Sequence, residues 1–76
     1  MKHIFFNKRG SSFFSLGQFD KAISLYEKAI LIKPNYFEAH CNLGQSNHKL
    51  GQLDTAVRSY KKAVDINPEL AVNHTN

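Results

Sequence analysis

The stretch from Leu16 to Pro34 reads LGQFDKAISLYEKAILIKP, and it returns from Leu50 to Pro68 as LGQLDTAVRSYKKAVDINP. The offset between the two copies is 34 residues, and ten of the nineteen aligned positions are identical. A period of this length, with two helical patterns in each period, is typical of a helix-turn-helix solenoid. The rest of the chain is therefore interpreted as further copies of this unit or departures from it.

Length and composition indicate one small domain. The chain has 76 residues, of which 42% are hydrophobic and 21% charged, which excludes a wholly disordered protein. The apolar run near the start ends after three residues, so we expect no export signal and no membrane span. Cys41 is the only cysteine and has no disulfide partner within the chain. These features predict a cytoplasmic protein.

The net charge of +4 does not by itself indicate a nucleic-acid partner. The ten basic residues are scattered, and no run of them is longer than two. Nucleic-acid binding usually requires a basic stripe or a recognition motif. We therefore expect neither nucleic acid nor a membrane as partner.

The first copy predicts two helices, from about residue 3 to 16 and from about residue 19 to 32. Four residues of the second helix fall at i, i+4, i+7 and i+8 and predict one buried stripe: Ala22, Tyr26, Ala29 and Ile30. The second copy predicts helices from about residue 36 to 51 and from about residue 53 to 66. Asn35 and Glu38 form an N-x-x-E pattern, which predicts a capping box at the start of the third helix. Asn67-Pro68-Glu69 predicts the beginning of one more helix.

Gly10 and Gly44 interrupt the first helix of each copy. Each costs about 1 kcal/mol relative to alanine. Their recurrence predicts a compensating close approach of two helices, opposite Ala22 and Ala56.

These positions together resemble the tetratricopeptide repeat. The residues that match are Gly10, Phe13, Gly17, Ala22, Tyr26, Ala29 and Pro34 in the first copy, and Leu43, Gly44, Gly51, Ala56, Tyr60, Ala63 and Pro68 in the second. The resemblance implies an all-α fold in which antiparallel helix pairs stack into a right-handed superhelix. It divides the single domain, residues 1–76, into repeats at 3–36 and 37–70, with a partial third repeat or short capping helix at 71–76. Arg9 and Asn47 stand where apolar and aromatic residues are usual, so we expect loose packing there.

The resemblance also implies a function. Such proteins are generally non-catalytic scaffolds for protein-protein interaction, and they bind an extended peptide or a partner helix in a concave groove lined by the first helix of each repeat. The groove-lining residues expected by this analogy are Ile4, Asn7, Lys8, Ser11 and Phe14 in the first repeat, and Glu38, Cys41, Asn42, Gln45, His48 and Lys49 in the second. Lys8, Asn42 and Lys49 would favour an acidic segment or a C-terminal carboxylate, because carboxylates accept charge-assisted hydrogen bonds.

Asn42 and Asn76 occupy equivalent positions 34 residues apart. Recurring asparagines at this position resemble the peptide-backbone ladder in the repeats of O-linked N-acetylglucosamine transferase. Lys8 takes the place in the first repeat, which limits the ladder to two. One alternative function is therefore the recognition part of a larger enzyme, such as a glycosyltransferase.

Nothing in the sequence predicts catalysis, a metal site or a cofactor. The histidines, His3, His40, His48 and His74, include no i, i+4 pair. Cys41 has no base close enough to activate it and is expected to be a quiet, partly buried thiol. Four of the six acidic residues fall on the second helices, away from the groove.

Phe5 predicts a surface for self-association. Its equivalent in the second repeat is Ala39, which should pack against a preceding helix, but no helix precedes Phe5. An exposed apolar end of this kind favours a homodimer that covers the open ends of the stack, or docking on another domain. The alternative is that Phe5 folds over its own helix pair.

Overall fold

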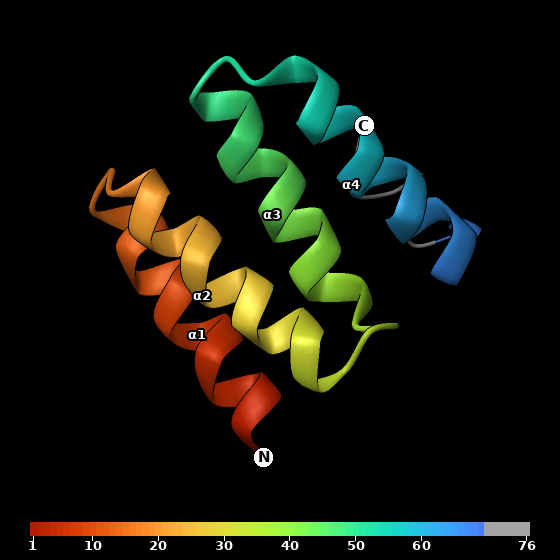
Figure 1. Cartoon of the computed structure of the whole chain (residues 1–76), viewed down its shortest axis with the longest axis horizontal. Coiled ribbons are helices and arrows are strands. Elements are labelled where there is room, and N and C mark those ends of the chain that lie inside the picture. Colours follow the sequence, from red (N-terminus) through yellow and green to blue (C-terminus); the bar gives the residue numbers. More distant parts are fainter. Residues whose placement is uncertain (70–76) are drawn as a thin grey trace.

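A computed structural model describes residues 1–69 as four α-helices arranged in chain order (Figure 1). They are α1 (Lys2–Ser15), α2 (Phe19–Ile32), α3 (Phe37–Lys49) and α4 (Leu53–Ile66). α1 packs against α2, α3 against α4, and α2 joins the two pairs by packing on α3. The all-α prediction of two stacked helix pairs is confirmed. None of these helices is long and apolar enough to cross a membrane.

A glycine lies in the turn that joins the two helices of each pair. Gly17 and Gly51 both have φ of +77°, in the left-handed region that only glycine enters without strain. The amide of Gly17 donates to Phe14 O (3.0 Å) and that of Gln18 to Phe13 O (2.9 Å), and the same two bonds recur after α3. This pattern satisfies the last carbonyls of the first helix and turns the chain sharply back.

The core of the first pair forms where α2 faces α1. Ala22 and Ala29 are fully buried, and Tyr26 is only 1% exposed. A Cβ atom placed on Gly10 would lie 2.7 Å from Cε1 of Tyr26. The predicted close approach at glycine is therefore present, but its partner is a tyrosine ring rather than Ala22.

The second pair repeats this arrangement. A Cβ atom on Gly44 would lie 2.8 Å from Cε1 of Tyr60, so here too the ring, and not Ala56, explains the glycine. Phe37, Cys41 and Ala63 form a buried cluster at the other end of the pair. The expectation of loose packing at Asn47 is wrong. Its side chain is 2% exposed, and Nδ2 donates to the carbonyl of Leu43 (3.0 Å).

The two pairs meet in a small apolar cluster formed by Ala29, Tyr36 and Ala39, with Phe6 and Ile30 packed against it. His40 fixes the loop at this junction, because its Nε2 donates to the carbonyl of Pro34 (2.8 Å). The predicted capping box does not form. α3 begins after Tyr36 as N-cap, and no side chain makes a capping hydrogen bond there.

Lysines of α2 and of the loop after it lie over three aromatic rings, of which two are half-buried and one, that of Tyr36, is buried. The ammonium groups of Lys21, Lys28 and Lys33 lie 5.4–5.8 Å from the ring centres of Phe13, Phe6 and Tyr36. This geometry is typical of cation–π contacts. These three lysines, among the ten scattered basic residues, therefore have a role in packing within the chain.

Pro68 and Glu69 have helical backbone at the end of the described part. The predicted partial repeat or capping helix at 71–76, including Asn76 and His74, lies outside the described residues.

Candidate functional site

The first helices of the two repeats, α1 and α3, contact each other along the predicted inner face. Asn7 of α1 and Asn42 of α3 meet there, and Nδ2 of Asn42 donates to Oδ1 of Asn7 at 3.0 Å. Both side chains are half-buried. The carboxamide of Asn42 keeps one N–H and its oxygen for a ligand. The sequence placed both residues on this face but did not predict that they pair.

Tyr36 lies next to this pair and shapes its surroundings. The ring of His3 packs edge-on against the Tyr36 ring with centroids 5.1 Å apart. Burial raises the pKa of the Tyr36 hydroxyl, the charge of Glu38 raises it further, and a hydrogen bond with Asn7 lowers it. Tyr36 is therefore a neutral neighbour that helps to hold Asn7 in place.

Two predicted groove residues are turned largely toward their own helix pair. The hydroxyl of Ser11 is hydrogen-bonded to the hydroxyl of Tyr26 (3.1 Å). The ring of Phe14 packs edge-on against Phe19 at 5.1 Å, beside the turn between α1 and α2. Both side chains are half-buried. Their contacts stabilise the first repeat and leave less of them for a ligand.

The remaining predicted groove residues are mostly accessible to solvent. Lys8, Glu38, His48 and Lys49 are exposed, and Gln45 is half-buried. Asn76, the predicted equivalent of Asn42 in a third repeat, lies beyond the described range.

Cys41 is not a groove residue, contrary to the expectation. It is 3% exposed and packs with Phe37 and Ala63 in the core of the second repeat. Burial raises the pKa of the Cys41 thiol, and the charge of Glu38 raises it further. A protonated thiol is a poor nucleophile. Within residues 1–69, no three histidine, cysteine or acidic side chains gather as metal ligands.

Phe5 lies on the outer side of α1 and is 54% exposed. Its ring contacts Phe6 edge-on at 5.5 Å, and the guanidinium carbon of Arg9 lies 5.7 Å from its centre. More than half of the ring remains in solvent.

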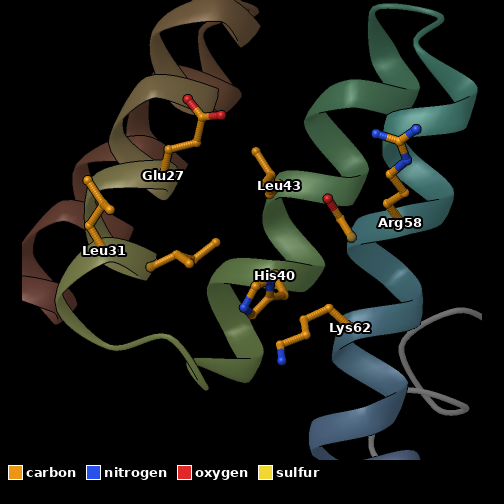
Figure 2. Close-up of a pocket in the computed structure, with 8 residues that line it drawn as sticks. Glu27, Leu31, His40, Leu43, Arg58 and Lys62 are labelled. Carbon is orange, nitrogen blue, oxygen red and sulfur yellow. The ribbon is translucent and has the colours of Figure 1, made fainter.

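Sequence reasoning missed a second concave surface, which lies between α2 and α4 with α3 as its floor (Figure 2). This surface, called here the α2–α4 groove, has a volume of about 540 Å³. It is lined by Glu27, Ile30, Leu31, His40, Leu43, Arg58, Ser59 and Lys62. The only signal in the sequence was Leu31, an apolar residue outside the buried stripe of α2. The groove joins elements from two repeats, which periodicity within one helix cannot reveal.

Comparison with known proteins agrees with the geometry. The family model described as TPR repeat matches residues 10–51, and the one described as tetratricopeptide repeat matches residues 37–70. No curated protein sequence matches the chain significantly. The first match alone covers more than half of the 76 residues. The chain therefore belongs to the tetratricopeptide repeat family.

Proposed function

We propose that this protein is a non-catalytic interaction module that holds an extended peptide against the inner face of α1 and α3. Repeats of this family generally mediate protein-protein interaction. The observation that supports the proposal is the Asn7–Asn42 hydrogen bond, which holds the Asn42 carboxamide between α1 and α3. The free N–H and oxygen of Asn42 match the carbonyl and N–H of a peptide backbone.

The charges around this pair favour an acidic peptide or a C-terminal carboxylate. Lys8 and Lys49 are both exposed on first helices, one in each repeat. A carboxylate receives a stronger hydrogen bond from an ammonium group than a neutral acceptor does. Glu38, near Tyr36, would oppose a negative charge at that end of the face.

A peptide-library screen followed by titration of the selected peptides tests the proposal. Asn42→Ala should weaken their binding by about tenfold, which corresponds to about 1.4 kcal/mol. Asn35→Ala is the matched control, because Asn35 is exposed in the loop between α2 and α3. Selected peptides that bind both variants equally would refute the role of Asn42.

Lys8→Glu and Lys49→Glu should shift the selected peptides away from acidic sequences, with Lys33→Glu as control. An unchanged preference for acidic peptides in both variants would remove the two lysines from the site.

A second proposal, association between copies, is favoured by apolar side chains exposed on α1 and α4, the first and last described helices. Phe5 is 54% exposed on α1, and Val57 and Val64 are about half exposed on α4. These two valines are equivalent to Ile23 and Ile30, which are half-buried in the first repeat. Sedimentation equilibrium of the wild type and a Phe5→Asp variant tests this proposal, since only a dimer held through Phe5 would dissociate.

The rival interpretation is that the repeats serve a larger enzyme, as the resemblance to O-linked N-acetylglucosamine transferase suggests. Its support in the described residues is Asn42 alone. The intact mass of the natural gene product distinguishes this rival, because an enzyme would require a mass well above 8.7 kDa.

A further inference from the structure

The α2–α4 groove and the proposed peptide site use different residues of α3, His40 and Leu43 for the groove and Asn42 for the peptide site. The α3 floor of the groove presents Leu43 beside His40, and its α2 wall presents Ile30 and Leu31 beside the carboxylate of Glu27. Leu31 is 82% exposed, although it borders this concavity. A large aliphatic side chain left in water next to an apolar hollow favours burial against a partner.

The α4 wall carries positive charge. Figure 2 shows Arg58 and Lys62 on α4, across the groove from Glu27 and Leu31 on α2. Arg58 and Lys62 are four residues apart, so they stand about one helical turn from each other. Among residues 1–69, neither has an ion-pair or hydrogen-bond partner. Together with the net charge of +4, they favour an acidic partner.

The backbone of the groove determines what conformation the partner can have. All three of its surfaces are α-helices, whose interior N–H and C=O groups bond within each helix. An extended peptide would find no backbone partners there and would leave its own polar groups against an apolar floor. An α-helix satisfies those groups internally. α2 and α4 also run in the same direction, so the groove follows the helix axes (Figure 1).

We propose that the α2–α4 groove binds an amphipathic, acidic α-helix of another protein. Aliphatic residues of that helix pack on Ile30, Leu31 and Leu43. Two carboxylates one turn apart on its flank pair with Arg58 and Lys62. This site is separate from the inner face, so a single chain can hold two partners at once.

A second copy of this chain does not fit the groove as well. Of its six acidic residues, only Asp65 and Glu69 are four apart, and α4 ends between them at Ile66. No described helix therefore offers two carboxylates one turn apart. A second copy would also bring a further charge of +4 to a wall that is already positive.

The probe for the test is a synthetic alanine-based helix of about 18 residues. It carries leucines at i, i+3, i+4 and i+7, and two glutamates one turn apart beside them. Its binding to the full chain is measured by fluorescence anisotropy at low and physiological salt. We expect Leu31→Ser to weaken binding at least tenfold, whereas Leu16→Ser, which changes another largely exposed leucine outside the groove, should leave binding unchanged.

Charge is tested on α4 itself. Lys62→Glu should weaken binding of the probe. Lys61→Glu makes the same change at the preceding residue, which does not line the groove, and should leave binding unchanged. A probe with lysines in place of its glutamates should bind the Arg58→Glu, Lys62→Glu double variant more tightly than it binds the wild type. Equal effects of Lys61→Glu and Lys62→Glu would reduce the interaction to nonspecific charge and overturn the proposal.

Three other outcomes would also overturn it. The first is absence of probe binding. The second is loss of binding in Asn42→Ala, which would place the helix on the inner face. The third is a wild-type dimer that Leu31→Ser dissociates, which would assign the groove to a second copy. Failure of the peptide screen on the inner face leaves this test unaffected, so the two proposals can fail separately.

Discussion

Each first helix contains a glycine, Gly10 in α1 and Gly44 in α3. A tyrosine ring occupies the space that a Cβ atom on that glycine would need. Tyr26 is 1% exposed and hydrogen-bonded to Ser11, so its ring is held in place at both ends. Tyr60 is half-buried and has more freedom to move. A methyl group at position 10 would therefore meet a fixed ring, whereas one at position 44 would meet a ring that can give way.

We expect Gly10→Ala to lower the free energy of unfolding by up to about 2 kcal/mol, because overpacking strain of about 1–3 kcal/mol outweighs a helix-propensity gain of about 1 kcal/mol when the ring is held in place. Gly44→Ala should have a smaller effect. Urea unfolding followed by circular dichroism measures both.

Ser24→Ala, on the exposed side of α2, is the control for propensity alone. If Gly10→Ala stabilises the protein as an unhindered helix substitution would, the contact with Tyr26 is not limiting. Introducing Gly10→Ala into a Tyr26→Leu background should remove most of the loss, since the double variant lacks the ring.

At this scale the sequence predicted that the glycines mark a close approach but assigned the wrong partner. Spacing shows which residues share a helix face, and Ala22 and Tyr26 share one. It does not show how far a ring extends along that face. The same limit applies to the candidate site, where the family resemblance led us to expect Asn7 and Ser11 on the inner face. It could not show that Asn7 bonds Asn42 while Ser11 bonds Tyr26.

One side chain fixes the loop between the two helix pairs. His40 is buried, and its Nε2 donates to the carbonyl of Pro34, the residue at which α2 cannot continue. His40→Phe keeps the ring and removes the donor. We expect a fall of roughly 1 kcal/mol in the free energy of unfolding, the usual net worth of one such bond.

His48→Phe is the control for His40→Phe, because His48 is exposed on the same helix. Hydrogen exchange at the Tyr36 amide, which donates to Lys33 O (3.1 Å) within this loop, should accelerate only in His40→Phe. Equal exchange in both variants would mean that the loop is held by packing alone.

At the scale of elements, the repeated pattern predicted all four helices and their turns. The capping box failed because the loop turns at Lys33–Tyr36 and delays the start of α3 by one residue. Asn35 then lies one residue before the N-cap. The α2–α4 groove could not be predicted, because it depends on how one repeat is placed on the next.

Within residues 1–69, four groups have raised pKa values, and all four act in the same direction on the stability of the whole molecule. Burial is the largest cause at Tyr26, Tyr36, Tyr60 and Cys41. A raised pKa means that the folded state keeps the proton at a pH where the unfolded chain has lost it. The contribution of these groups is complete below the unfolded values, about 9.0 for the thiol and 10.0 for the hydroxyls, and is lost as the pH rises through the folded ones.

We therefore expect the free energy of unfolding to fall progressively above pH 9, as measured by urea unfolding at pH 7, 9, 10 and 10.5 at constant ionic strength. Tyr26→Phe should be less stable at pH 7, because it loses the bond to Ser11, yet it should lose less stability between pH 9 and 10.5. This smaller loss of stability at alkaline pH distinguishes titration of Tyr26 from general destabilisation. A destabilised variant that still contained the buried hydroxyl would show the same pH dependence of stability as the wild type. A wild type equally stable at pH 7 and 10.5 would contradict the assignment, and so would a Tyr26→Phe variant with the same alkaline loss.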